Sequence, residues 1–196
     1  MKMARSGFSL VELLCVVAIV GLLMFFMTSH GDSPEKRARV ACQRNLEKIS
    51  LALSIYANDS QGAFPVATNA VSSEAVLSLL VPRSTAMTEI FICPGSGDKP
   101  LAEGEPFTNS RISYAYYMGL KSANDPGAVL VTDWQVDTNA KLQGQRLFSL
   151  DGSPPGNNHG KSGGSLMQAD GRMEFSPAKA VRDLPLASGL QLLNPK

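Results

Sequence analysis

Glu12 is the only charged residue in a long apolar run, Phe8–Met27, near the start of the chain. An ionised carboxylate inside a bilayer costs about 2.5–3.5 kcal/mol even on lenient insertion scales. The carboxylate therefore either reaches back to the lipid headgroups or pairs with a cation inside the membrane. Cleavage after Gly7 would create such a cation, because the new α-amino group of Phe8 would lie about one helical turn from Glu12.

The apolar run has the length of a membrane span, since as a helix it extends about 30 Å. Lys2 and Arg5 precede it and no cation follows before Lys36, so the positive-inside rule predicts a cytoplasmic N-terminus and an extracytoplasmic remainder. The main rival is an ordinary secretory signal peptide, whose apolar region is only about 7–15 residues long and ends in a small-x-small site. The run here is longer and lacks that ending.

Residues 6–14, Ser-Gly-Phe-Ser-Leu-Val-Glu-Leu-Leu, resemble the class III signal of type IV pilins and of the pseudopilins of type II secretion. The resemblance implies that a prepilin peptidase cleaves between Gly7 and Phe8 and that Phe8 is N-methylated. It also implies that Glu12 neutralises the free amine of an adjacent subunit during assembly. The implied partners are other pilin subunits, the peptidase and an inner-membrane assembly platform.

The pattern of the segment that follows the apolar run predicts a second helix, which is amphipathic. A capping residue and Pro34 mark its start, and apolar residues then recur at steps of three and four until near Asp59. These residues are Ala38, Cys42, Leu46, Ile49, Leu53 and Tyr56. Residues 56–65 also resemble a stretch that follows the long helix in secretion-type pseudopilins. We therefore divide the chain into a leader (1–7), a span (8–28), an amphipathic helix (29–61) and a globular head with a C-terminal hairpin and tail (62–196).

Strand signals dominate the head. Aromatic and apolar runs predict strands at 112–118 and 128–134. Asp170-Gly171 suits a two-residue type I′ turn, which predicts a hairpin with Leu166 opposite Phe175. The expected fold is α+β and pilin-like, with a long N-terminal helix that first spans the membrane and then packs on a small antiparallel sheet.

The three cysteines have separate interpretations. Cys15 lies in the span and acts as a small apolar residue. Cys42 lies on the apolar stripe and Cys93 follows a short strand, and both would face an oxidising compartment. A Cys42–Cys93 disulfide would contribute about 4 kcal/mol in the chain-entropy model. Two buried free thiols are the alternative, and the sequence does not decide between them.

Enzyme and nucleic-acid signals are weak, so we predict no catalytic residues. The chain has 196 residues and a net charge of +1, without the basic excess of a phosphate-binding module. The segment from Gly156 to Ser162 lacks the spacing of a nucleotide-binding loop. A hydrolytic triad of His159, a serine and an aspartate such as Asp133 or Asp170 lacks the Gly-x-Ser-x-Gly elbow.

His159 followed by Asp170-Gly171 resembles the C-terminal signature of a prepilin-like subgroup, although ten residues separate the histidine from the aspartate where nine are usual. We interpret His159 and the neighbouring asparagines as a structural tie between a loop and the hairpin. The resemblance to major secretion pseudopilins also raises calcium as a cofactor. The available oxygen ligands match no linear calcium loop, so no metal ligands are assigned; they are Asp125, Asp133, Asp137, Asp151, Asn157 and Asn158.

The predicted function is a pilin-like structural subunit of the inner membrane that assembles into a type II secretion pseudopilus or a type IV pilus-like filament. The alternative is a membrane-tethered extracytoplasmic binding domain or enzyme that uses a pilin-type anchor. The sequence does not distinguish secretion from pilus formation or DNA uptake, nor a major from a minor subunit.

Overall fold

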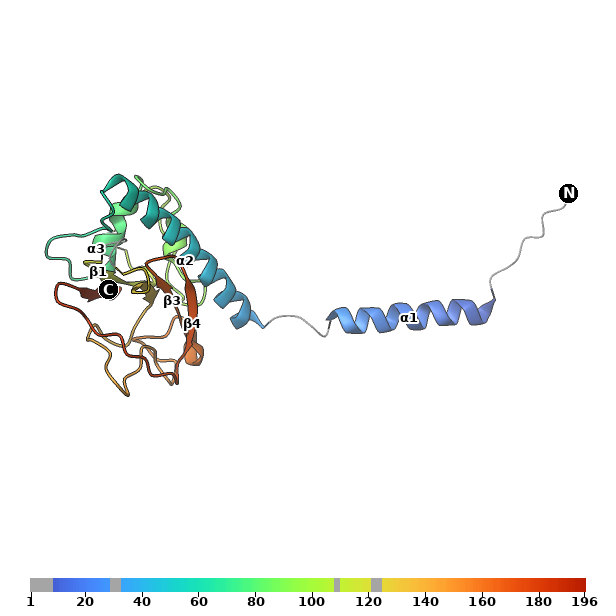
Figure 1. The fold of residues 1–196 in the computed structure, drawn as a ribbon. Coiled ribbons are helices and arrows are strands. Elements are labelled where there is room, and N and C mark those ends of the chain that lie inside the picture. The colour runs from blue at the N-terminus through green and yellow to red at the C-terminus, as the bar shows by residue number, and fades with distance from the viewer. Residues whose placement is uncertain (1–8, 29–32, 108–109, 121–124) are drawn as a thin grey trace. The chain divides into compact units, whose positions relative to one another are not determined.

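The computed structural model describes residues 9–28, 33–107, 110–120 and 125–196. The chain divides into two compact units, Met1–Pro34 and Glu35–Lys196. The first unit contains the helix α1 (Leu10–Thr28), and the second contains almost all of the helix α2 (Pro34–Asp59) together with a five-stranded sheet (Figure 1).

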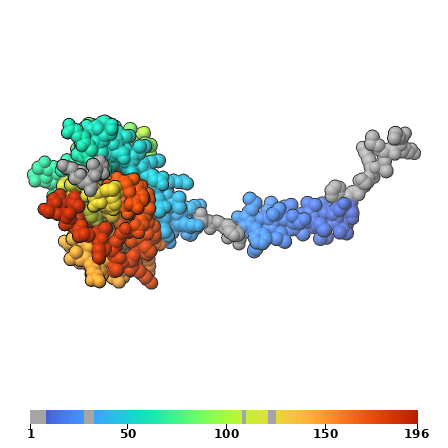
Figure 2. Space-filling view, viewed as in Figure 1, coloured from blue at the N-terminus to red at the C-terminus, as the bar shows by residue number. Residues whose placement is uncertain are grey.

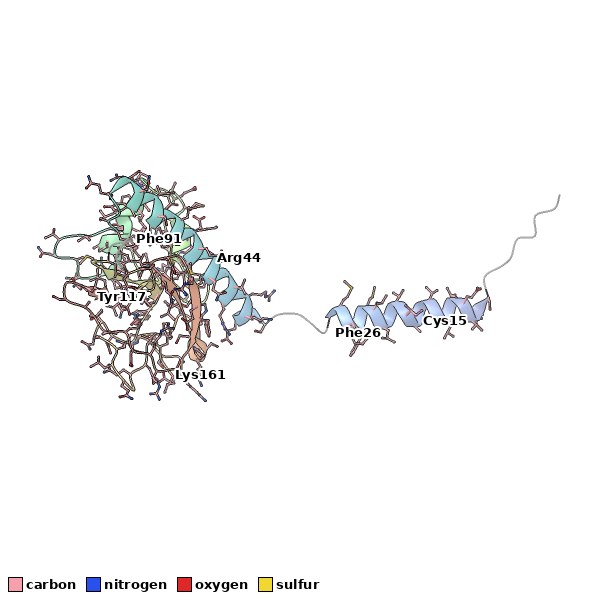
Figure 3. All side chains as sticks on the ribbon, in the orientation of Figure 1. Cys15, Phe26, Arg44, Phe91, Tyr117 and Lys161 are labelled. Atoms are coloured by element: carbon pink, nitrogen blue, oxygen red, sulfur yellow. The ribbon has the colours of Figure 1, made fainter. Side chains whose placement is uncertain are left out.

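The helix α1 is apolar around its whole circumference. Its large apolar side chains from Leu10 to Met27 are each at least 44% exposed, and side chains extend from all sides of the helix (Figure 3). Leu10–Met27 is long and apolar enough to cross a membrane. A core helix of a soluble domain would instead bury at least one apolar stripe.

The helix α2 buries one face, as the apolar periodicity predicts. Its buried residues are Cys42, Leu46, Ile49, Ala52, Leu53 and Ala57. The helix ends where Gln61 and Gly62 adopt positive φ, and the Gly62 N–H donates to the Ala57 carbonyl at 2.8 Å. This left-handed ending satisfies a carbonyl of the last turn and turns the chain back toward the head.

The sheet is antiparallel throughout, with the strand order β4-β3-β2-β1-β5. Its strands are β1 (Tyr114–Met118), β2 (Val129–Asp133), β3 (Gly163–Gln168), β4 (Met173–Pro177) and β5 (Gln191–Leu193). The strands predicted at 112–118 and 128–134 are confirmed as β1 and β2. The C-terminal segment, expected as a tail, instead supplies β5, which pairs with β1.

One face of the sheet packs against α2. Tyr114, Asp133, Ser165 and Phe175 stand in one row across four strands. From α2, the Cys42 Sγ lies 3.3 Å from the Tyr114 hydroxyl, and the Arg39 guanidinium lies 3.6 Å from the centre of the Phe175 ring. The α+β, pilin-like fold predicted for the chain is confirmed.

Short helices and loops complete the second unit. The short helices are α3 (Ser73–Leu77), η1 (Ser78–Leu80), η2 (Thr88–Phe91) and η3 (Gly160–Ser162). Two loop segments are joined by isolated bridges, Lys141 with Leu184 and Arg146 with Val181. The C-terminal part of the chain, orange to red in Figure 2, forms much of the visible surface of this unit.

The predicted hairpin forms, but its predicted register is wrong by one residue. Phe175 lies opposite Ser165 and not Leu166, which pairs with Glu174. A type I′ turn needs positive φ at both central residues, whereas in this turn only Gly171 has one, at 85°. The Gly171 N–H donates to the Gln168 carbonyl, so the loop has three residues with a left-handed glycine at its end.

The packing of α2 yields a matched pair of variants. Leu46 is fully buried against the core, whereas Leu51 on the same helix is 63% exposed. We expect Leu46→Ala to lower the free energy of unfolding by about 2–5 kcal/mol and Leu51→Ala to change it by less than about 0.5 kcal/mol. Urea unfolding followed by circular dichroism measures both, and equal losses would contradict the packing described.

Candidate functional site

Four titratable side chains from four separate segments meet between α2 and the sheet. Cys42 lies on the buried face of α2, Cys93 follows η2, Asp133 ends β2 and His159 immediately precedes η3. Their sulfur, nitrogen and carboxylate oxygen atoms all lie within 4.8 Å of one another. None of the four residues is more than 4% exposed.

Backbone contacts hold the Cys93 loop against its neighbours. The Cys93 N–H donates to the Ser113 hydroxyl at 2.8 Å, and the Asn45 side chain on α2 donates to the Ile92 carbonyl at 2.9 Å. A Cβ at Gly95 would lie 2.5 Å from the Asn158 carbonyl oxygen. Glycine is therefore required at position 95 for the segment carrying His159 to approach this closely.

Asp133 is the most heavily hydrogen-bonded of the four residues. Its Oδ1 accepts from the Asn158 amide at 2.8 Å and from the Cys42 thiol at 3.2 Å. Its Oδ2 accepts from the Ser165 N–H at 2.7 Å and lies 3.4 Å from the His159 Nε2. A carboxylate removed from water needs such partners, because an unpaired buried charge is strongly destabilising.

The surroundings shift the pKa values of three of the four groups. Burial raises the pKa of the Cys42 thiol well above its ordinary value. Interaction with Cys42, joined by that with His159, outweighs burial and lowers the pKa of Cys93 to about 7. Burial disfavours the His159 cation, but interactions with Asp133 and Cys93 outweigh it and raise the pKa of the imidazole to about 10. The cluster thus favours a thiolate at Cys93 beside an imidazolium at His159.

The cluster does not have the geometry of a catalytic relay. In such a relay the histidine uses one ring nitrogen for the nucleophile and the other for the acid. Here the same atom, the His159 Nε2, lies 3.4 Å from both the Cys93 Sγ and the Asp133 Oδ2. The Nδ1 atom is buried and has no hydrogen-bond partner among the described residues. The sulfur, nitrogen and oxygen atoms of the four residues therefore face one another within a single buried cluster.

Both cysteines of the predicted pair are free thiols in the structure. The Cys42 thiol donates to Asp133 and the Cys93 sulfur faces His159. Of the two alternatives that the sequence leaves open, the structure contains the second, two buried thiols. Asp133 and His159, considered from the sequence with a serine as a hydrolytic triad, lie instead beside two cysteines.

His159 and Asp170 take part in two separate hydrogen-bond networks. Among the described residues no hydrogen bond or ion pair joins them. His159 belongs to the buried cluster, whereas the Asp170 carboxylate accepts from the backbone N–H and the Nε of Arg172 within the hairpin turn. The predicted tie between the His159 loop and the hairpin is indirect, since it passes through Asp133, which accepts from Ser165 in β3.

At the other end of the chain, Gly7 and Phe8 lie outside the described residues, and Glu12 lies in the first turn of α1. The Glu12 carboxylate accepts a hydrogen bond from the Ser9 N–H at 3.0 Å. The Leu13 N–H donates to the Ser9 carbonyl, which makes Ser9 the residue that caps the helix. Ser9-x-x-Glu12 is a capping-box sequence, a signal that the sequence analysis did not use.

The candidate calcium ligands are divided among several local networks. Asp133 and Asn158 share a hydrogen bond within the buried cluster. Asp137 pairs with Lys141, Asp151 accepts from Ser149 and Ser153, and Asn157 donates to the Gly152 carbonyl. Calcium binding stays a prediction.

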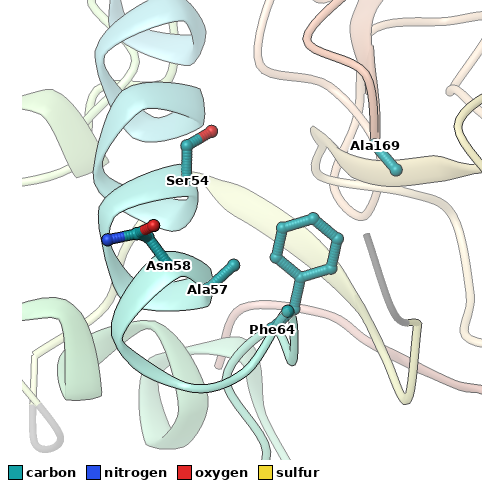
Figure 4. A pocket seen from close by; sticks show the side chains of 6 residues that line it. Ser54, Ala57, Asn58, Phe64 and Ala169 are labelled. Atoms are coloured by element: carbon teal, nitrogen blue, oxygen red, sulfur yellow. The ribbon is translucent and has the colours of Figure 1, made fainter. Parts of the chain in front are cut away.

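A pocket of about 350 Å³ lies between the end of α2 and the hairpin turn (Figure 4). It is lined by Ser54, Ala57, Asn58, Gly62, Phe64 and Ala169. None of these six residues is charged, and the Ser54 hydroxyl is already used, because it donates to the Ser50 carbonyl within α2. The pocket thus offers few groups for specific polar recognition.

Comparison with known sequences and structures identifies one segment. Residues 2–28 match a family described as the prokaryotic N-terminal methylation motif. No curated protein and no solved structure matches the chain significantly. The motif covers the basic leader, Gly7, Phe8 and Glu12 and ends where α1 ends.

The hydrogen bonds of Asn158 yield a test of the cluster. Its amide donates to Asp133 and to the Ser113 carbonyl. We expect Asn158→Asp to lower the free energy of unfolding by at least about 2 kcal/mol at pH 7, because both donors are lost and two carboxylates meet. The loss should shrink at pH 5, since the repulsion raises the pKa of the new carboxyl, whose protonated form can donate.

Urea unfolding of the variant and the unaltered protein at both pH values measures this difference. A group with a raised pKa in the folded state contributes stability at low pH that is lost as the pH rises. An equal loss at pH 5 and pH 7 would indicate a packing defect and contradict the electrostatic interpretation.

Proposed function

We propose that this chain, which carries the prepilin-type signal of type IV pilins and pseudopilins, is a structural subunit that assembles into a filament. One observation carries the proposal: the methylation motif includes an apolar helix in which Glu12 is the only charged side chain. A prepilin peptidase would cleave between Gly7 and Phe8, and the new amine of Phe8 would be methylated.

The position of Glu12 supports its role in assembly. Its carboxylate already accepts a hydrogen bond from the backbone of Ser9. Cleavage would place a positive charge on Phe8, the residue that immediately precedes this donor. In the low dielectric of a bilayer or a packed helix bundle, the carboxylate and the amine attract each other strongly. The pairing of Glu12 with the amine of an adjacent subunit would set the register between neighbouring subunits.

The exposed apolar surface of α1 supports the same mechanism. Large side chains such as Leu10, Phe25 and Met27 are exposed and need a nonaqueous environment. Lipid supplies that environment while the subunit waits in the membrane. In a filament, the α1 helices of neighbouring subunits would replace the lipid, so the subunit leaves the bilayer without exposing α1 to water.

The proposed location is the inner membrane, with a single span. Lys2 and Arg5 would remain in the cytoplasm, and the unit Glu35–Lys196 would lie on the extracytoplasmic side. The similarity of residues 56–65 to secretion-type pseudopilins favours a type II secretion pseudopilus over a type IV pilus. The partners would be other pilin-like subunits, the prepilin peptidase and the assembly platform in the inner membrane.

Two substitutions of Glu12 separate charge from helix capping. Glu12→Gln keeps an oxygen that can accept from the Ser9 N–H, whereas Glu12→Val removes both the charge and the acceptor. We expect mass spectrometry to find a methylated Phe8 at the N-terminus of both variants. We also expect the recovery of each in a sheared filament fraction to fall at least about tenfold, which corresponds to a loss of 1.4 kcal/mol per contact.

Assembly of Glu12→Gln with failure of Glu12→Val would show that capping, and not charge, is required. Normal assembly of Glu12→Val would contradict the proposal. An unaltered protein that is processed but never enters a filament fraction would support the alternative, a tethered extracytoplasmic domain.

A further inference from the structure

We propose that Cys42, Cys93, Asp133 and His159 form a structural zinc site that fastens α2 to the sheet. The four side chains supply two sulfurs, one imidazole nitrogen and one carboxylate, and these atoms lie within 4.8 Å of one another. Cysteine sulfur, histidine nitrogen and carboxylate oxygen all bind Zn²⁺ in proteins, and structural zinc centres take four ligands in a tetrahedron. The site is separate from the N-terminal signal and does not rest on the proposed assembly function.

Two of the distances between the facing atoms match the edges of a tetrahedral zinc centre. Zinc bonds of about 2.0–2.3 Å imply ligand-to-ligand edges of about 3.3–3.8 Å. The Cys93 Sγ and the His159 Nε2 are 3.4 Å apart, and that nitrogen is 3.4 Å from the Asp133 Oδ2. The Cys42 Sγ is 3.2 Å from the other Asp133 oxygen, Oδ1, slightly closer than such an edge. Side-chain adjustments are needed to bring one Asp133 oxygen and the other three ligand atoms, all within 4.8 Å of one another, around a single ion.

The same distances are poor for hydrogen bonds between charged groups. A charged N–H···O bond is typically about 2.7–2.9 Å long, yet the His159 Nε2 lies 3.4 Å from the Asp133 carboxylate. A single nitrogen bears one proton and cannot donate it well to both the Cys93 sulfur and the Asp133 oxygen. One cation at the centre of the cluster satisfies all the facing atoms at once.

Donors outside the cluster are aimed at the atoms that would carry negative charge. The Gly95 N–H donates to the Cys93 Sγ at 3.4 Å. A Cys42 thiolate carries no proton, so in that state the Tyr114 hydroxyl, 3.3 Å from the Cys42 Sγ, would be the donor to this sulfur. Asp133 accepts from the Asn158 amide and the Ser165 N–H. Such outer hydrogen bonds orient metal ligands and stabilise thiolates.

The chemistry of the ligands selects zinc over calcium. Calcium takes six to eight hard oxygen ligands, whereas the cluster offers two sulfurs and a nitrogen. Thiolates and imidazole suit Zn²⁺, and four protein ligands close the coordination sphere, which is typical of a structural and not a catalytic site. Complete burial of the side chains agrees with a closed site.

A site built from four segments couples metal binding to folding. The ligands come from α2, the loop after η2, the end of β2 and the turn before η3. The unfolded chain does not hold these residues together, so the free energy of binding contributes to the free energy of folding. Bound zinc would also keep the two neighbouring thiols from forming a disulfide, because both sulfurs would be occupied as ligands.

Zinc content is measured on the full chain purified in detergent without chelator, incubated with ZnCl₂ and desalted. We expect about one zinc per chain by inductively coupled plasma mass spectrometry. Cys42→Ser and Cys93→Ser should lose most of this zinc. The matched control is Cys15→Ser, which alters the third cysteine, in α1, and should keep the stoichiometry of the unaltered protein.

Two measurements on the unaltered protein do not depend on the folding of a variant. Co²⁺ alone should produce thiolate-to-cobalt charge-transfer absorption and the intense visible bands of a tetrahedral centre. Zn²⁺ at about 100 times its Kd should raise Tm by about 5–10 °C, and EDTA should reverse the shift. CaCl₂ at the same concentration should leave Tm unchanged.

Tyr114→Phe tests a positioning residue, since it removes one donor and leaves all four ligands. We expect about a 10- to 100-fold weaker affinity for Co²⁺ with the tetrahedral spectrum retained. The proposal is overturned if the unaltered protein binds no zinc and peptide mapping finds a Cys42–Cys93 disulfide. It is also overturned if Co²⁺ gives no charge-transfer band, if Ca²⁺ and not Zn²⁺ raises Tm, or if folded Cys93→Ser retains full zinc content.

Discussion

The folded unit is organised around a carboxylate that has no contact with water. Asp133 is fully buried at the end of β2, and an isolated buried charge would cost more than most domains have in net stability. Its oxygens are instead approached by Cys42 of α2, Ser165 of β3, and Asn158 and His159 of the loop before η3. The requirement to satisfy this group brings together segments that are far apart in sequence.

The need to pair the Asp133 carboxylate also explains the residue types at several positions around it. Gly95 leaves room for the backbone of Asn158, and Gly164 lies where a Cβ would be 2.9 Å from the Asp133 Cβ and 2.5 Å from the Phe148 ring. The Asn158 side-chain amide donates one hydrogen bond to Asp133 and one to the Ser113 carbonyl. Apolar packing of α2 supplies most of the stabilisation, and the polar cluster determines which residues must face one another.

The two units of the chain differ in the exposure of their apolar side chains. In Glu35–Lys196 most of the large apolar side chains pack into one core, and Asp133 is paired within the fold. In α1 the apolar side chains remain exposed, so that lipid or other helices must cover them. Glu12 is the single charged group in that helix, and its carboxylate accepts a hydrogen bond from the Ser9 N–H.

Local sequence determined the parts of this protein that depend on neighbouring residues. The apolar run, the leader motif, the three-and-four spacing of α2 and the strands β1 and β2 are all read within short windows, because helix and strand periodicity are local properties. The predicted register of the hairpin is wrong because it depends on one backbone dihedral. Gly171 has a positive φ and Asp170 does not, and this difference lengthens the loop by one residue.

The buried cluster was decided by the tertiary structure alone. The four residues of the cluster are distant in sequence and follow no metal-binding spacing; they are Cys42, Cys93, Asp133 and His159. The sequence around each one therefore does not indicate a shared role. Their convergence depends on the packing of α2 on the sheet and on the order of the strands, which arise from long-range contacts. The sequence by itself thus established the N-terminal methylation motif and its apolar helix, and the fold established which distant side chains share one buried cluster.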